Sequence, residues 1–233
     1  MVWQDGAHGC FDGEYHDLVW GRKVVDGKEL FAQMSLASQQ AGVSWRIVWN
    51  KSEHYRAAFH GFDMRRVAVM TDAEMDGLVD REGKWAGKLM QNRNKLQAIV
   101  HNAKLCVEIE DTHPGGLSGF FWSFVRGRED VTINSHERSS SEYETVFGQT
   151  SEFSDAMEKE LKKTRGFKFL GSITLQAFML QCGLLNGHCP RCPCNPRSRA
   201  AAAAKVCTPV STGKKRQRAS EAASQARASR IRL

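Results

Sequence analysis

The 233-residue sequence lacks the long apolar span that a membrane-crossing helix requires. Its most apolar stretch, residues 169–185, is interrupted by glycine, serine, threonine and glutamine, whereas a bilayer demands about 20 consecutive apolar residues. The first fifteen residues include Asp5, His8, Asp12 and Glu14 and contain no apolar signal core, so neither a secretory signal nor an Arg-rich transit peptide is visible. These absences predict a protein with no membrane partner that resides in the cytoplasm or the nucleus.

Alternation of apolar and polar residues, the pattern typical of strands, is also scarce, and no internal repeat is present. Apolar residues instead recur at helical spacing and predict helices over 29–41, from Trp45 toward Phe59, and over 93–106, 117–125, 153–163 and 172–185. Gly42 is placed to end the first helix, Ser44 to cap the second, and residues 71–74 form a capping-box pattern before another. The proline, glycine, serine and asparagine in residues 113–116 and 129–142 indicate surface loops. The expected fold class is therefore all-α.

Acidic residues are nearly absent from the C-terminal segment, where residues 197–233 contain ten basic residues and only Glu221 as a counter-charge. The segment is rich in alanine, serine and arginine and has almost no large apolar residues, so we expect it to be disordered. We expect a single globular domain over 1–196 and a disordered basic tail over 197–233. The cluster 214–218 is a candidate nuclear signal or phosphate contact, and a solvated extension without a fixed role is the alternative.

The seven cysteines are odd in number and unevenly placed, and without an export signal metal binding is favoured over a disulfide framework. His188 stands directly ahead of three cysteines, Cys189, Cys192 and Cys194. Cysteine and histidine are ligands that Zn²⁺ prefers, and His16 and Cys10 near the other end of the domain are candidate partners. Reduced surface cysteines are the alternative interpretation.

Two further groups of residues invite a functional interpretation beside a structural one. Large rings at Tyr15, Trp20, Trp45, Trp49 and Trp122 are typical of a core, or of a stacking pocket for a flat ligand such as a nucleobase. The polar, basic residues 91–95 precede a predicted helix, where they indicate either a solvated turn or a contact for a phosphate.

Several short motifs extend across residues 10–196. They are Tyr15-His16-Asp17 with Trp20-Gly21, Gln40-Ala41-Gly42-Val43-Ser44-Trp45, Asn92-Arg93-Asn94-Lys95-Leu96-Gln97-Ala98, Phe121-Trp122-Ser123-Phe124, Arg165-Gly166-Phe167-Lys168-Phe169-Leu170-Gly171, and Gly183-Leu184-Leu185-Asn186-Gly187-His188 followed by Cys192. In content and order these motifs resemble the DNA-3-methyladenine glycosylase I family of base-excision repair. The resemblance implies an all-α, helix-hairpin-helix glycosylase fold with a zinc site that joins the two ends of the domain.

The resemblance also implies an enzyme that flips an alkylated purine out of double-stranded DNA and hydrolyses its N-glycosidic bond, without a lyase step. By match to the family's motifs, Tyr15 and Trp45 form the base pocket, and Arg93 and Lys95 lie in the DNA-binding hairpin. His16, His188 and Cys192 match zinc ligands. Cys10 is the candidate for the fourth, with Cys189 or Cys194 as local alternatives. A monomer is expected.

The chain departs from the family pattern at the pocket. Ala37 occupies the position of a family glutamate that hydrogen-bonds the extruded base, and a charge-assisted hydrogen bond contributes roughly 1.5–3 kcal/mol. Asp12 replaces a second pocket tyrosine, and Trp3 stands where the family has its N-terminal zinc-binding cysteine. The catalytic group is therefore unidentified, with Glu14 as a substitute candidate beside Tyr15. The alternative function is a catalytically impaired member that binds alkylated or distorted DNA.

Overall fold

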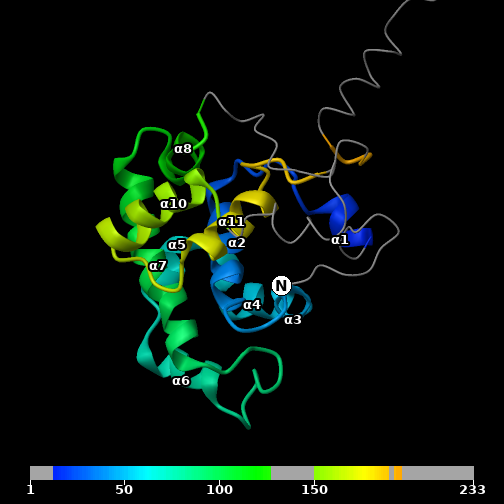
Figure 1. Ribbon diagram of the computed structural model, residues 1–233. Coiled ribbons are helices and arrows are strands. Elements are labelled where there is room, and N and C mark those ends of the chain that lie inside the picture. The colour runs from blue at the N-terminus through cyan, green and yellow to red at the C-terminus, as the bar shows by residue number, and fades with distance from the viewer. Residues whose placement is uncertain (1–12, 127–149, 189–191, 196–233) are drawn as a thin grey trace, which may run out of the picture. The chain divides into compact units, whose positions relative to one another are not determined.

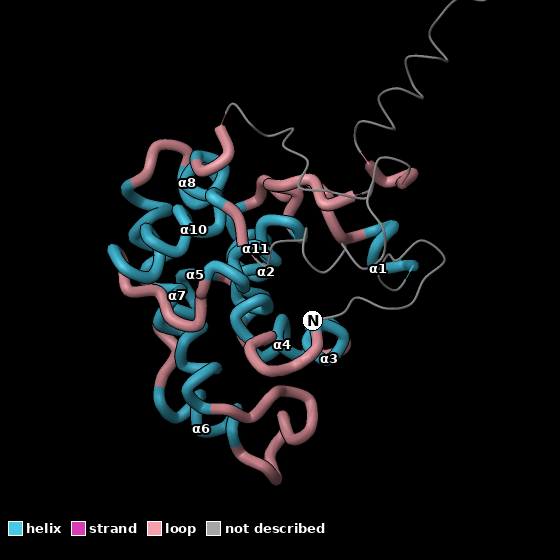
Figure 2. Tube along the Cα trace, in the orientation of Figure 1, coloured by secondary structure: helices cyan, strands magenta, loops and turns pink. Residues whose placement is uncertain are grey.

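The computed structural model describes residues 13–126, 150–188 and 192–195, and this part of the chain is built from helices joined by loops (Figure 1). The first half contains α1 (Gly13–Leu18), α2 (Gly27–Gln39), α3 (Trp45–Trp49), α4 (Ser52–Ala58), the 3₁₀ turn η1 (His60–Phe62), α5 (Met64–Ala68) and α6 (Asp72–Val79). The second half contains α7 (Arg93–Thr112), α8 (Gly116–Ser123), α10 (Glu152–Glu158), the π-helix η2 (Lys159–Thr164) and α11 (Ser172–Gln181). Figure 2 shows no strand among these residues, so the all-α prediction is confirmed.

Helices α2 and α7 form the centre of the packing. Helix α2 contacts α3, α4, α7, α8 and α11, and Figure 1 shows it beside α11. Ten residues of α2, from Leu30 to Gln39, are buried, so this helix has almost no solvated face. Helix α7 buries the stripe that contains Leu96, Ile99 and Ala103, as its helical spacing predicts. These two helices therefore form the frame against which most of the other described helices pack.

The caps predicted from sequence are largely present. Gly42 adopts a φ of 79°, a left-handed conformation that favours glycine, three residues after α2 ends at Gln39. The Thr71 side chain accepts a hydrogen bond from the Glu74 amide while the Glu74 carboxylate accepts one from the Thr71 amide, which is a complete capping box. Ser44 stands at the N-cap of α3 but makes no capping hydrogen bond with its side chain.

Two predicted helices are interrupted in the structure. The helix predicted from Trp45 toward Phe59 is wrong as a continuous element, because α3 ends at Trp49 and α4 begins at Ser52. The Lys51 amide bonds Val48 three residues back, which tightens the last turn of α3. The helix predicted over 153–163 changes from α10 into a π-helix after Glu158.

The chain divides into two compact units, Met1–Cys192 and Pro193–Leu233. The helices above belong to the first unit, and only residues 193–195 of the second are described. The predicted tail over 197–233 and the predicted loop over 129–142 lie outside the described residues, so the domain boundary near residue 196 stays a prediction. Within the described residues, no helix combines the length and the apolar character needed to span a bilayer.

Candidate functional site

The C-terminal end of α2 leads through a short turn to α3. We call this segment, residues 37–45, the pocket wall because it carries Ala37 and Trp45, which the sequence assigns to a base pocket. Ala37 lies in the last turn of α2 and is fully buried. The Gln40 amide bonds the Ala37 carbonyl and the Val43 amide bonds the Gln40 carbonyl, so the chain reverses over residues 40–44. Trp45 is then the first residue of α3 and is only 2% exposed.

Tyr15 from α1 packs against this wall. Its ring centroid lies 6.0 Å from that of Trp45 and 4.5 Å from that of Trp49, and the Tyr15 ring is tilted against both. The structure therefore brings together the two aromatic residues that the sequence assigned to a base pocket. Trp49 joins them because it follows Trp45 by one helical turn, a spacing that was visible in the sequence.

The chemistry of Tyr15 is set by its burial. Desolvation raises the pKa of the Tyr15 phenol well above its usual range, the hydrogen-bonding contact with Trp45 lowers it, and the nearby Cys182 thiol raises it. The phenol is therefore neutral at physiological pH, which leaves it able to form hydrogen bonds and ring contacts but not to act as a phenolate base. Glu14 lies in α1 beside Tyr15, but its side chain lies outside the described residues.

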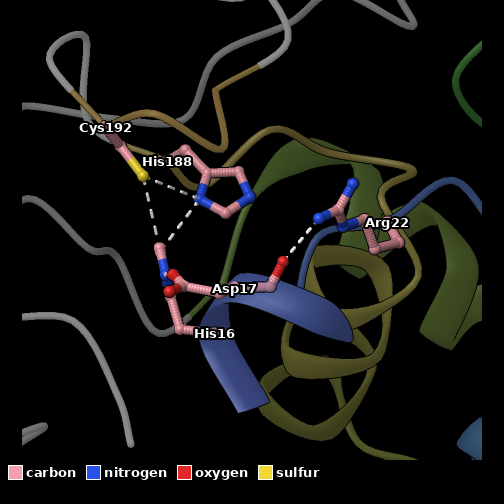
Figure 3. Close-up of polar contacts among 5 residues, drawn as sticks. All are labelled: His16, Asp17, Arg22, His188 and Cys192. Atoms are coloured by element: carbon pink, nitrogen blue, oxygen red, sulfur yellow. Dashed lines mark hydrogen bonds and ion pairs between the residues drawn. The ribbon is translucent and has the colours of Figure 1, made fainter. Parts of the chain in front are cut away.

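A second cluster brings the two ends of the first unit together. The His16 Nε2 atom in α1 lies 3.2 Å from the His188 Nδ1 atom, and the Cys192 Sγ atom lies 3.5 Å from each of these nitrogens (Figure 3). All three side chains are buried. Nitrogen and sulfur donors that converge in this way suit a tetrahedral Zn²⁺ ion, which prefers histidine and cysteine ligands.

The surroundings of the two imidazoles are compatible with a role as metal ligands. The Asp17 carboxylate lies 2.8 Å from His16 Nδ1, which leaves Nε2 directed at His188 and Cys192. Burial lowers the pKa of His188 to about 4, with further lowering by the neighbouring His16 and Arg22 side chains, so the His188 ring is neutral. Gly21 is required beside this ring, because a Cβ atom there would lie 2.5 Å from His188 Nε2. Cys10 and Cys189 lie outside the described residues.

The two residues predicted to bind DNA are engaged in contacts within the protein. Arg93 forms an ion pair with Asp76 of α6. The Lys95 Nζ atom donates hydrogen bonds to the carbonyl oxygens of Gln39, at 3.1 Å, and Ala41, at 2.6 Å. Lys95 thus anchors the turn that carries the pocket wall, a role that the sequence analysis missed because it depends on a contact between distant segments. The DNA contact of both residues stays a prediction.

Comparison with known proteins gives consistent results. Residues 9–195 match the family model for methyladenine glycosylase. The chain is 40% identical over 185 residues to "DNA-3-methyladenine glycosylase 1" of Escherichia coli (strain K12), covering 79% of this chain and 91% of that protein. A DNA-3-methyladenine glycosylase of Haemophilus influenzae is 40% identical over 181 residues, covering 78% and 90% of the two chains.

Solved structures agree with these sequence relatives. A crystal structure of 3-methyladenine DNA glycosylase I superposes with a TM-score of 0.67 at 36% identity, covering 78% of this chain and 93% of that chain. A variant of 3-methyladenine DNA glycosylase I in complex with 3-methyladenine superposes with a TM-score of 0.65 at 33% identity, covering 78% and 91%.

Proposed function

Because the chain belongs to the methyladenine glycosylase family, we propose that it is a DNA-3-methyladenine glycosylase of base-excision repair. It extrudes an alkylated purine from DNA and hydrolyses the N-glycosidic bond, leaving an abasic site. The observation that carries this proposal is the buried pairing of Tyr15 with Trp45 in a chain 40% identical to enzymes of that name. The alternative of a lesion binder without activity is not favoured, because these relatives are glycosylases.

The proposed mechanism uses the properties of the damaged base. A 3-methyladenine in DNA is cationic and is therefore already a good leaving group, so the protein contributes chiefly extrusion, positioning and exclusion of water. The aromatic faces of Tyr15 and Trp45 attract a cationic base more strongly than neutral adenine, by roughly 0.5–2 kcal/mol per ring. Extrusion costs a few kcal/mol and is cheapest for damaged pairs. Ala37 offers no carboxylate. Among Tyr15, Trp45 and Ala37, the two stacking rings are therefore the main source of selectivity for the damaged base.

We propose that the buried cluster of His16, His188 and Cys192 holds a structural zinc ion. Support comes from the convergence of three donor atoms, the neutral state of His188 and the carboxylate beside His16. Cys10 is the proposed fourth ligand. A zinc ion bound here would fasten α1 to the segment that follows α11, and no step of the reaction uses it.

We also propose the form of the substrate and the role of the tail. Duplex DNA bound by a monomeric protein is the expected complex, with a helix-hairpin-helix arrangement of α6 and α7 presenting Arg93 and Lys95. The basic cluster 214–218 would add sequence-independent affinity for phosphates and would serve as a nuclear import signal.

The decisive experiment measures release of 3-methyladenine from methylated duplex DNA under single-turnover conditions. We expect the native protein to release the base and Trp45→Ala to release it roughly 10- to 100-fold more slowly, because stacking on one ring is worth about 1–3 kcal/mol. Trp122→Ala is the matched control, because it also removes a tryptophan. Trp122 lies in α8, and its indole donates a hydrogen bond to the Val24 carbonyl oxygen. Absence of release by the native protein, with release by Ala37→Glu, would identify a binding protein instead.

A further inference from the structure

A buried glutamine in α2 has an oxygen atom that the rest of the described protein does not use. Gln33 is 8% exposed, and its Oε1 atom is buried without a hydrogen-bond partner among the described residues. A buried carbonyl without a partner is costly, so such atoms are rare and frequently belong to functional sites. Its position therefore calls for an explanation in terms of a ligand or a structural water.

The orientation of this amide is fixed by its neighbour. Gln33 Nε2 donates a 2.9 Å hydrogen bond to the Glu29 carboxylate, which in turn accepts two hydrogen bonds from Arg56, at 3.0 and 3.1 Å. A carboxylate only accepts hydrogen bonds, so the nitrogen of Gln33 must face Glu29 and the oxygen must face away. The chain from Arg56 through Glu29 also polarises the amide, which strengthens its oxygen as an acceptor.

The spacing along α2 relates Gln33 to the position of the missing carboxylate. Gln33 precedes Ala37 by four residues, so both lie on one face of α2. A longer side chain at position 37 would extend toward the helix N-terminus and cover the turn that contains Gln33. The Cys182 thiol interacts electrostatically with both the Glu29 carboxylate and the Tyr15 phenol.

We propose that Gln33 Oε1 accepts a hydrogen bond from the exocyclic amine of the extruded adenine, in the place of the carboxylate absent at Ala37. Glu29 is a positioning residue that holds the amide in the accepting orientation. The inference rests on the proposed function for the identity of the base. An uncharged acceptor binds more weakly than a carboxylate, so the pocket recognises the base with less discrimination by charge.

The test measures binding of free 3-methyladenine to the full-length protein by titration calorimetry. We expect Gln33→Leu to weaken binding about tenfold, the effect of losing one buried hydrogen bond. Gln176→Leu is the matched control, because Gln176 is also a buried glutamine with an unpartnered Nε2 atom, in α11. Its affinity should change by less than about twofold. Unchanged binding by Gln33→Leu, or an equal loss in Gln176→Leu, would overturn the proposal and assign Gln33 to packing.

Rescue separates recognition from structure. The double variant Gln33→Leu with Ala37→Glu should recover the affinity, because a carboxylate then supplies the acceptor, whereas a packing defect would persist. If Gln33→Leu does not fold, Glu29→Ala keeps Gln33 but frees its amide, and about a threefold loss of affinity is expected. No loss in Glu29→Ala would then count against the proposal.

The same variants distinguish this inference from the proposed function. If the native protein releases the base and Gln33→Leu releases it equally well, the role of Gln33 is refuted while the proposed function stands. Binding of free 3-methyladenine that depends on Gln33, without release from methylated DNA, supports the role of Gln33 and refutes the enzymatic function.

Discussion

Individual polar residues in this protein join helices that are far apart in the sequence. Tyr55 of α4 is fully buried, and its hydroxyl lies 3.5 Å from the Gln39 side-chain oxygen while it accepts a hydrogen bond from the Met90 amide at 3.3 Å. The Gln39 amide nitrogen donates to the Lys95 carbonyl oxygen. This network fixes the end of α2, and hence the pocket wall, against the start of α7.

The ionisation of Tyr55 gives a pH-dependent prediction. Burial raises the pKa of Tyr55 to about 12, against an unperturbed value of about 10, and the hydrogen bond from Met90 lowers it. Because the folded state favours the neutral phenol, the contribution of Tyr55 to stability is fully present below pH 10 and is lost as the pH rises from 10 through 12. We expect the free energy of unfolding to fall by about 2–3 kcal/mol across this window.

Urea unfolding between pH 8 and pH 11.5 measures this effect. Tyr55→Phe should lower by about one the number of protons released on unfolding at alkaline pH. Tyr143→Phe is a control with the same chemical change in a segment outside the described residues. An identical alkaline slope for the native protein and Tyr55→Phe would contradict the assignment.

The structure brings together the predicted residues whose type carries the chemistry, and their roles stay predictions. Tyr15 and Trp45 lie together, and His16, His188 and Cys192 converge, as their motifs indicate. The roles that depend on one specific partner were invisible. The acceptor at Gln33 exists only because Glu29 binds its nitrogen, and no spacing rule distinguishes that glutamine from others in the chain.

At the scale of helices, the end of α2 depends on a cation from α7. The last carbonyl groups of a helix have no partners within it and carry partial negative charge. The Lys95 ammonium lies against the carbonyls of Gln39 and Ala41, and burial lowers the pKa of this lysine. Lys95→Met should therefore destabilise the protein by roughly 1–2 kcal/mol.

Chemical denaturation of Lys95→Met measures this loss, with Lys104→Met as the control because Lys104 is an exposed lysine on the same helix. Equal stability of the two variants would show that the carbonyl contacts contribute nothing. The salt dependence of DNA binding is a separate readout. If Lys95→Met lowers the magnitude of the slope of log affinity against log salt by about 0.9, Lys95 also contacts a phosphate.

Helix boundaries show where sequence patterns lose their predictive value. The capping box at Thr71 and the left-handed Gly42 were predicted because their chemistry is local. The break between α3 and α4 was not predicted, because the apolar spacing continues through it. At this break the Lys51 ammonium donates a hydrogen bond to the carbonyl oxygen of Gly87, a contact between distant segments. The change to a π-helix at Lys159 has no signal in the apolar spacing either, because only the hydrogen-bond register changes.

At the scale of the molecule, charge is concentrated in the C-terminal segment. Replacing the four cations of the cluster 214–218 by glutamine in the full chain should lower the slope of log affinity against log salt by roughly 3–4, if each contacts one phosphate. Equilibrium binding to undamaged duplex DNA between 50 and 200 mM salt, conditions in which such contacts are resolved, measures the slope. The single-turnover rate at saturating protein should stay unchanged. An unaltered slope would remove the cluster from the DNA-binding surface.

The two ends of the first unit meet at the His16, His188 and Cys192 cluster, and this determines how a bound metal would act on stability. His16 and His188 are 172 residues apart, so a ligand bridge between them closes a long loop and reduces the entropy of the unfolded chain. By analogy with a covalent crosslink of such length, removal of the metal should cost roughly 5 kcal/mol and lower the melting temperature by about 15 °C. We expect one zinc per chain by elemental analysis of the native protein.

Cys192→Ser should lose both the metal and this increment of stability, because the serine hydroxyl is a poor zinc ligand. Cys106→Ser is the matched control, since Cys106 is equally buried in α7 but lies outside the cluster. It should lose stability while it retains zinc. Cys10→Ser tests the proposed fourth ligand by the same two measurements. Metal-free native protein that melts at the same temperature with and without a chelator would show that hydrogen bonding within the cluster suffices to hold α1 in place.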